Sequence, residues 1–358
     1  MATAGQRPTA TTGQRPSETT GQHPSATTGQ RPSALRIRTV TGSVSPSRIR
    51  GPVLAHEHLA LDLSRETDPD AVLLPAAHGP DVVTELISLR EEFGLALVIE
   101  LTCRGMGRDP GALARMSAAS GVAVVAGTGW YHERFHPAEL ARAGVGELTD
   151  VLVGEIDHGI GSRAVRPGVI GEVGSHGEQP REQEARVLVA AARAATATGL
   201  SVATHARLGA GGPGQLDLLV GAGLPAHRIS IGHQDLLDAP AVHRELAASG
   251  AYVAFDTIGK RDYQSDETRL RLLLALLEAG HADRVLLSCD ISRHRYLLRE
   301  GGHGYGHLFR SFLPGLRARG VDDELIDLMT RRNPLRFLTG ATEGEDGPDP
   351  PDPAGGRT

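Results

Sequence analysis

The sequence predicts a single α/β domain with the fold of a (β/α)8 TIM barrel. Short, almost continuously apolar segments alternate with helical segments through most of the 358 residues. Strands that are apolar on both faces are typical of a parallel sheet covered by helices. Eight such strand and helix units in roughly 250 to 300 residues match the size of a TIM barrel.

The eight expected strands are bounded by turn residues. They cover residues 51–58, 95–103, 121–130, 167–175, 200–206, 228–234, 251–259 and 284–292. Helical patterns lie between most of them and usually end at the glycine favoured after a helix C-terminus. The expected helices cover residues 81–93, 111–120, 181–199, 214–223, 239–250 and 266–280. An open doubly wound sheet is the alternative fold. We disfavour it because ligand-type residues follow both the first and the last strand, which meet only in a closed barrel.

Both ends of the chain differ in composition from this body. Residues 1–34 repeat GQRPTATT, GQRPSETT, GQHPSATT and GQRPSA with a period of eight, and such low-complexity sequence predicts a disordered tail. Residues 341–358 are acidic and rich in proline and glycine, which predicts a second disordered tail. The barrel is therefore expected over 35–340. The N-terminal segment lacks the apolar region of a secretory signal, so we expect a cytoplasmic protein. A transit peptide is the alternative, given the arginines, the threonines and the single Glu18, but the pattern has no amphipathic period.

The charge pattern bears on the class of partner. The formal net charge is -6 and no basic block occurs, which argues against nucleic acid or an anionic membrane as a partner. No apolar stretch reaches the roughly 18 residues that a membrane-spanning helix needs. We therefore expect a small-molecule substrate.

Ligand-type side chains stand at the ends of the expected strands. In GPVLAHEHLA, alternation along an extended strand directs His56 and His58 to one face and Glu57 away from it. Two imidazoles on one face can hold a divalent ion. Four more such residues close later apolar runs: Glu172, His205, His233 and Asp290. Six nitrogen and oxygen ligands predict two divalent metal ions. Zinc fits the histidine-rich set best, although manganese, cobalt and iron would also accept it.

Other polar side chains follow the strand ends and are expected near the mouth of the barrel. They are Trp130, Tyr131, Arg207, Lys260, Arg261, Tyr263, Arg293, His294 and Tyr305. Of these, Tyr131, Arg207, Lys260, Arg261 and His294 are the expected substrate contacts. Cationic side chains there suit a substrate with a carboxylate or phosphate. A structural role is expected for His132, His136, His158, His243 and His281.

The ordered ligand set resembles the phosphotriesterase family of the amidohydrolase superfamily. The segments FDTIGKRDYQSDETR, SCDISRHRYLLREGGHGYGHLF and RRNPLRFL are most similar to its phosphotriesterase homology proteins. The best-known family pattern has a carboxylated lysine on strand four, where this chain has Glu172 in GVIGEVG. Because glutamate has the shorter arm, this departure argues against organophosphate hydrolysis as the main activity.

The resemblance implies a division of the ligands and a reaction. His56, His58 and Asp290 would hold a buried ion, and His205 and His233 a more exposed one, with Glu172 and a hydroxide shared. The bridging hydroxide would attack an ester, lactone or phosphoester, and the exposed ion would polarise the reacting C=O or P=O. Asp290 would also be catalytic, since it would orient the hydroxide and take its proton. The resemblance further suggests a homodimer.

Two other function classes stay open on the sequence. One is a metal-free barrel isomerase or lyase that uses the histidines as acid and base. The other is a catalytically inactive barrel that serves as a binding scaffold. A full ligand set argues against the scaffold, and the metal content of the purified protein separates the isomerase from the hydrolase.

Overall fold

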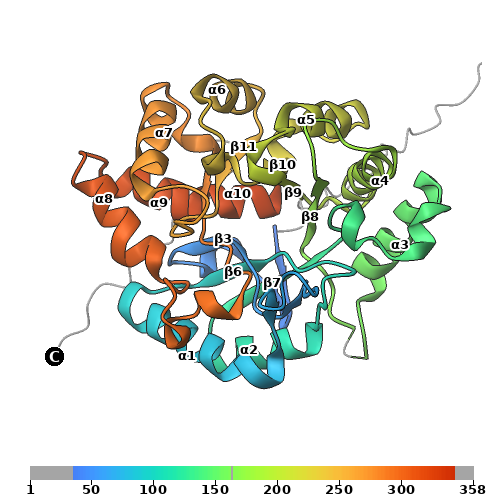
Figure 1. Cartoon of the computed structure of the whole chain (residues 1–358), viewed down its shortest axis with the longest axis horizontal. Helices are drawn as coiled ribbons and strands as arrows, with labels where there is room; N and C mark the ends of the chain where they lie inside the picture. Colours follow the sequence, from blue (N-terminus) through green and yellow to red (C-terminus); the bar gives the residue numbers. More distant parts are fainter. Residues whose placement is uncertain (1–34, 163, 343–358) are drawn as a thin grey trace, which may run out of the picture. The chain divides into compact units, whose positions relative to one another are not determined.

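The computed structural model describes residues 35–162 and 164–342, so nearly all of both predicted tails lies outside the described residues. Eight parallel strands form the centre of the molecule, and helices surround them (Figure 1). Their order in the sheet follows their order in the chain. They are β3 (Val53–Glu57), β6 (Leu97–Glu100), β7 (Ala123–Thr128), β8 (Val169–Ser175), β9 (Val202–Ala206), β10 (Ile229–Ile231), β11 (Tyr252–Phe255) and β12 (Val285–Leu287). All eight lie within the predicted segments.

The sheet closes into a nearly complete barrel at the junction of β12 and β3. No strand pairing forms between these two fully described strands, but the Asp290 amide donates to the carbonyl of His56 at 3.2 Å. The buried Glu57 carboxylate completes the junction by accepting three hydrogen bonds from the β12 side. The donors are Ser288 Oγ at 2.8 Å, the Cys289 amide at 2.8 Å and the Ile291 amide at 2.7 Å. The predicted TIM barrel is thus confirmed.

Helices cover the outside of the strands. The six that were predicted are α1 (Pro75–Phe93), α2 (Pro110–Ser120), α4 (Glu182–Thr198), α5 (Gly212–Gly221), α6 (Pro240–Ala248) and α7 (Asp266–Glu278). Those not predicted are α3 (Val145–His158) and the closing helices α8 (Leu313–Arg317), α9 (Asp323–Asp327) and α10 (Asn333–Thr339). No helix among the described residues is both long and apolar enough to span a membrane.

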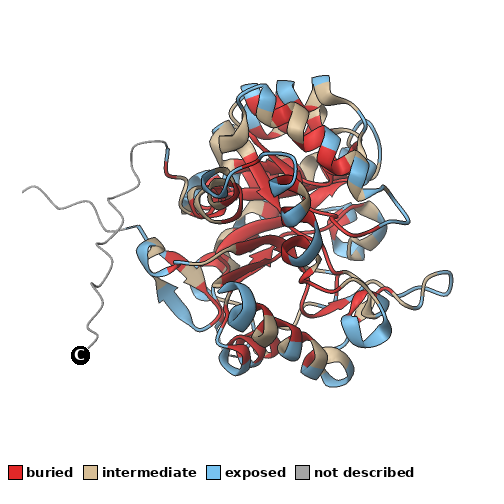
Figure 2. Ribbon diagram, turned by 90° about the vertical axis from the view of Figure 1, so that its left-hand side faces the viewer, coloured by how far each residue is buried: buried red, intermediate tan, exposed pale blue. Residues whose placement is uncertain are grey.

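Apolar residues form two clusters, and buried residues are concentrated in the strands at the centre (Figure 2). The larger cluster joins the strands to the surrounding helices. The smaller one takes alternate strand residues such as Val53, Leu97 and Val125, together with Phe337 of α10. Because successive side chains of a strand point to opposite faces, one set packs against the helices and the other fills the barrel.

Two short antiparallel hairpins stand outside the barrel sheet. The first pairs β1 (Ile37–Thr39) with β2 (Gly42–Val44), and the second pairs β4 (Leu61–Asp62) with β5 (Val72–Leu73). The β4–β5 loop is tied to the segment after β12, because the Arg293 guanidinium binds both carboxylate oxygens of Asp68. It is tied to the segment after β7 as well, since the Arg65 guanidinium lies 4.3 Å from the centre of the Phe135 ring.

Candidate metal centre

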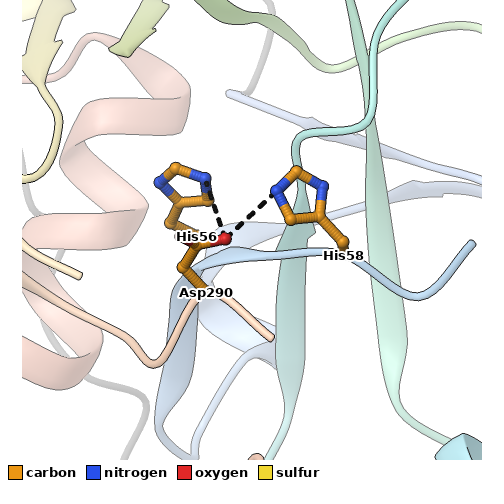
Figure 3. A group of neighbouring side chains, drawn as sticks. All are labelled: His56, His58 and Asp290. Carbon is orange, nitrogen blue, oxygen red and sulfur yellow. Dashed lines mark ion pairs between the residues drawn. The ribbon is translucent and has the colours of Figure 1, made fainter. Parts of the chain in front are cut away.

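The six predicted ligands meet at the C-terminal ends of the barrel strands. His56 lies near the end of β3, His58 directly follows that strand, and Asp290 follows β12. In Figure 3 a carboxylate oxygen of Asp290 lies between the two imidazoles. Asp290 Oδ1 is 3.2 Å from His58 Nε2 and 4.0 Å from His56 Nε2. These three buried residues offer ligand atoms close enough to share one ion.

A second set lies beside the first. Glu172 of β8, His205 of β9 and His233, which follows β10, are also buried and also present mutually close ligand atoms. His233 Nε2 is 2.8 Å from His205 Nδ1, and Glu172 Oε2 is 3.1 Å from the same nitrogen. These residues could therefore hold a second ion.

Glu172 stands between the two sets. Its Oε1 lies 3.3 Å from His58 Nε2, in the first set. Its Oε2 lies 3.1 Å from His205 Nδ1 and 3.6 Å from His233 Nε2, in the second. Glu172 Oε2 also lies 3.7 Å from His56 Nε2, in the first set. The carboxylate is therefore close to imidazole nitrogens of both sets, as a bridging ligand must be.

Local backbone irregularities aim several of these side chains. The pairing of β3 with β6 shifts register between Leu54 and Glu57, and that of β8 with β9 shifts between Ile170 and Val173. Such bulges redirect side chains and are common beside active sites. His233 and Asp290 have φ of 57° and 49°, a conformation that non-glycine residues rarely adopt. Strain of this kind gathers at functional sites.

Asp256, directly after β11, fixes the orientation of one histidine from each set. Its Oδ2 is 2.7 Å from His56 Nδ1, and its Oδ1 is 2.9 Å from His233 Nδ1. An acceptor on Nδ1 places the imidazole proton there and leaves Nε2 free to bind a metal. His58 is oriented in the same way, since its Nδ1 is 2.8 Å from Thr102 Oγ1.

The electrostatics of the cluster fit a cationic occupant. His56 Nε2 is buried and has no hydrogen-bond partner. Burial works to lower the pKa of His58, but Asp290 and Glu172 outweigh it and raise that pKa to about 9. Burial likewise opposes, and Asp256 drives, the rise in the pKa of His233 to about 10. The carboxylates thus favour positive charge among the imidazoles, and divalent ions would supply it.

Lys260 contacts the carboxylate of Asp290 from the side opposite the histidines. Its ammonium donates to Asp290 Oδ2 and, at 3.0 Å, to Ser292 Oγ. Burial raises the pKa of Asp290, but the charge of Lys260 and the contact with His58 lower it well below its usual range. Asp290 is therefore ionised, with Oδ1 toward the imidazoles and Oδ2 toward the ammonium.

A cavity of about 370 Å³ opens over the cluster. Its lining includes Tyr131, Arg207 and Lys260 from the expected substrate contacts, with Tyr263 and Arg293. Arg261 and His294 do not line this cavity. His294 instead stacks on His78 and lies 3.4 Å from Asp70.

Two residues expected near the mouth are buried elsewhere. The Trp130 ring packs beside the Arg104 guanidinium at 5.6 Å. The fully buried Tyr305 donates its hydroxyl to the carbonyl of His58 at 2.7 Å. Tyr305 therefore supports the strand that carries the ligands.

Sequence reasoning missed three residues of this region. Asp256 ends a strand in FDTIG, as the assigned ligands end theirs, and that position was the available signal. His132, expected to be structural, lines the cavity, as does His176. Their rings lie 5.0 Å apart, and the His132 ring lies 5.5 Å from that of His205.

The sequence profile of the phosphotriesterase family matches residues 35–338. This chain belongs to the phosphotriesterase family. The expected resemblance is thereby confirmed, and the family supports a metal-dependent hydrolase. The chain is 38% identical over 289 residues to the phosphotriesterase homology protein of Escherichia coli (strain K12), which covers 80% of this chain and 98% of that protein. The crystal structure of the E. coli protein, complexed with phosphate in its active site, has a TM-score of 0.78 and covers 81% of this chain and 99% of that one.

Two further relatives are named for hydrolase activities. The N-acetyltaurine hydrolase of Rattus norvegicus is 30% identical over 344 residues, covering 85% of this chain and 98% of that protein. A mutant of a phosphotriesterase-like lactonase from Deinococcus radiodurans is 30% identical, with a TM-score of 0.75, and covers 84% of this chain and 99% of that one.

Proposed function

We propose that this protein is a binuclear metal-dependent hydrolase that cleaves an ester, lactone or phosphoester bond of a small anionic metabolite. The observation that carries the proposal is the position of Glu172. Its Oε1 faces His58 of the first set, and its Oε2 lies between His56 of the first set and the two histidines of the second. A carboxylate placed in this way is suited to hold two cations at once.

The residues present fit a metal pair. His56, His58 and Asp290 would hold one ion, and His205 and His233 the other, with Glu172 shared. Two divalent ions would lower the pKa of a water between them and polarise the reacting C=O or P=O. Asp256 and Thr102 keep His56, His233 and His58 in the tautomer that ligation through Nε2 needs. His205 instead presents Nδ1 to the cluster. Zinc suits the donor set best, and manganese, cobalt and iron are the alternatives.

Asp290 is placed to move a proton. Its Oδ1 lies in the first ligand set, and its Oδ2 is held by Lys260 at the cavity wall. A carboxylate kept ionised in this way can orient a water and accept its proton during bond cleavage. Because Lys260 lowers the proton affinity of Asp290, the proton would pass readily to the leaving group.

The relatives broaden the range of bonds to be tested. A lactonase supports the ester and lactone classes. An N-acetyltaurine hydrolase, whose substrate is the amide of a small sulfonate, adds the carboxamide as a second candidate class. In both cases the bond cleaved is an acyl bond, so the same polarising and proton-transfer tasks apply.

Elemental analysis and a substrate screen on one preparation test the proposal. We expect close to two divalent ions per chain, and turnover of at least one compound among lactones, carboxylic esters, phosphoesters and N-acyl amides. One ion or none after expression in metal-supplemented medium would refute the binuclear centre and favour the isomerase. Two ions with no turnover would favour a binding scaffold. A homodimer and a cytoplasmic location remain part of the proposal, and gel filtration with light scattering tests the first.

A further inference from the structure

We propose that Arg207 and Arg134 bind the anionic group of the substrate on the cavity wall built by the segments after β7 and β9. This inference rests on the proposed function, because it names the substrate class of the same cavity. Four lysine and arginine side chains line the cavity: Arg134, Arg207, Lys260 and Arg293.

Two of the four already have carboxylate partners. Lys260 is paired with Asp290, and Arg293 binds both oxygens of Asp68. Both follow the last strands of the barrel, β11 and β12. A substrate anion on this wall would compete with protein carboxylates for each cation. Lys260 and Arg293 are therefore poor anchors for an added negative charge.

The other two have no such partner. Among the described residues, no carboxylate lies within 4.0 Å of a guanidinium nitrogen of Arg207 or Arg134. Arg207 Nη1 instead donates to His176 Nε2 at 2.6 Å, so a neutral side chain holds its guanidinium at the cavity. Arg134, His176 and Arg207 follow the consecutive strands β7, β8 and β9, which places them on one wall. Arginine recognises carboxylate, sulfonate and phosphate through paired N–H donors.

Buried polar atoms mark the same wall. His132 is only 5% exposed, yet its Nδ1 is buried without a hydrogen-bond partner, and so is Nδ1 of His176. Both residues line the cavity. Buried polar atoms are usually satisfied, so two unpaired nitrogens in residues that line the cavity give this wall unused hydrogen-bonding capacity.

The spacing limits the size of the substrate. Ring centres are 5.5 Å apart from the candidate ligand His205 to His132, and 5.0 Å apart from His132 to His176. The proposed anion subsite is therefore separated from the candidate ligand His205 by two successive ring-to-ring contacts. The matching substrate is a small acyl compound whose carboxylate, sulfonate or phosphate is a few bonds from the scissile carbonyl.

Calorimetric titration of the full-length, metal-supplemented protein with succinate and with butyrate tests the inference. One carboxylate of either acid can bind at the ligand cluster, and only succinate has a second one for Arg207. We expect wild type to prefer succinate by about 2- to 5-fold, the range for an ion pair with an exposed arginine such as Arg207. Arg207→Gln should remove most of that preference, with butyrate unchanged, and Arg134→Gln should remove part of it.

Arg181→Gln is the matched control. It removes the same charge from an exposed arginine that pairs with Glu133 at 3.3 Å and does not line the cavity. The preference should survive in this variant. An equal loss in Arg181→Gln, no preference in wild type, or a preference retained in Arg207→Gln would each overturn the inference. A preference that depends on Arg207, without turnover of any ester, lactone or amide, would support the anion subsite and count against the proposed hydrolase.

Discussion

Replacing Asp256 with asparagine should weaken the two ions unequally. Asp256 Oδ1 accepts two hydrogen bonds, one from the His233 amide and one from His233 Nδ1, each at 2.9 Å. Asp256 Oδ2 accepts one, from His56 Nδ1. In the Asp256→Asn variant, we expect the single side-chain oxygen to take the Oδ1 position, because two hydrogen-bond donors of His233 face that position. The amide nitrogen then faces His56 Nδ1, and a donor facing it forces the His56 proton onto Nε2, the atom that would bind metal.

The size of the effect follows from this geometry. Losing the carboxylate that orients a metal-bound histidine typically costs about 10- to 100-fold in affinity, equivalent to about 1.4 to 2.8 kcal/mol. We expect that loss for the ion held by His56, His58 and Asp290. A smaller loss is expected for the ion held by His233, whose acceptor is retained.

Native mass spectrometry combined with chelator competition measures both affinities. Asp262→Asn is the control, because Asp262 is 79% exposed in the loop after the same strand and pairs only loosely with Arg295, at 3.9 Å. Wild-type affinity for both ions in Asp256→Asn would refute the orienting role. Earlier loss of the ion bound by His233 would refute the assignment of the two acceptors.

Three other perturbations test different parts of the proposal. Glu172→Gln should lower the metal count below two, because a neutral amide cannot offset two cations as a carboxylate does; an unchanged count at equal metal concentration would leave Glu172 a structural residue. Asp290→Asn should lower kcat by about 100- to 10,000-fold, with a smaller loss of metal affinity. It should also lower Tm, because the buried Lys260 ammonium loses its carboxylate partner. A near-normal rate at equal metal content would make Asp290 a ligand only. Burial, with the charge of Lys260, lowers the pKa of His303 to about 4. As pH falls, His303 is therefore protonated in the unfolded chain before it is protonated in the folded protein, so stability should fall from about pH 6.5 toward pH 4. The Tm of His303→Asn should fall less steeply over that range. A slope identical to that of wild type would contradict a role of His303 in this pH dependence.

The barrel strands were predictable because each is a short apolar run that ends at a turn or a polar residue. Helix α3 was missed because Gly146 and Gly154 are poor helix formers, although the buried Leu148, Leu152 and Ile156 recur every four residues. The β4–β5 hairpin was missed because two-residue strands show no alternation. In both cases tertiary packing, rather than local propensity, decides the structure.

The candidate site was predictable to the extent that its residues end strands. His56, His58, Glu172, His205 and Asp290 meet because the carboxyl ends of parallel strands lie at one mouth. Which side chains turn outward could not be predicted in this way. Tyr305 was expected at the mouth and is buried, and Asp256 was passed over although it contacts two ligands. Side-chain direction after a strand depends on loop conformation, which sequence position alone does not determine.

The first ligand set spans the junction at which the barrel closes. His56 lies in the first barrel strand, His58 directly follows it, and Asp290 follows the last strand. Glu57 accepts a hydrogen bond from the Cys289 amide, which is 232 residues away in the sequence. An ion bound by this set would join two distant parts of the chain where no strand ladder does so, and it would stabilise only the closed form. Opening the junction and releasing the ion thus become one equilibrium. The rate of hydrogen exchange at the Cys289 and Ile291 amides should therefore decrease as the metal site fills, which reports metal occupancy without any substrate.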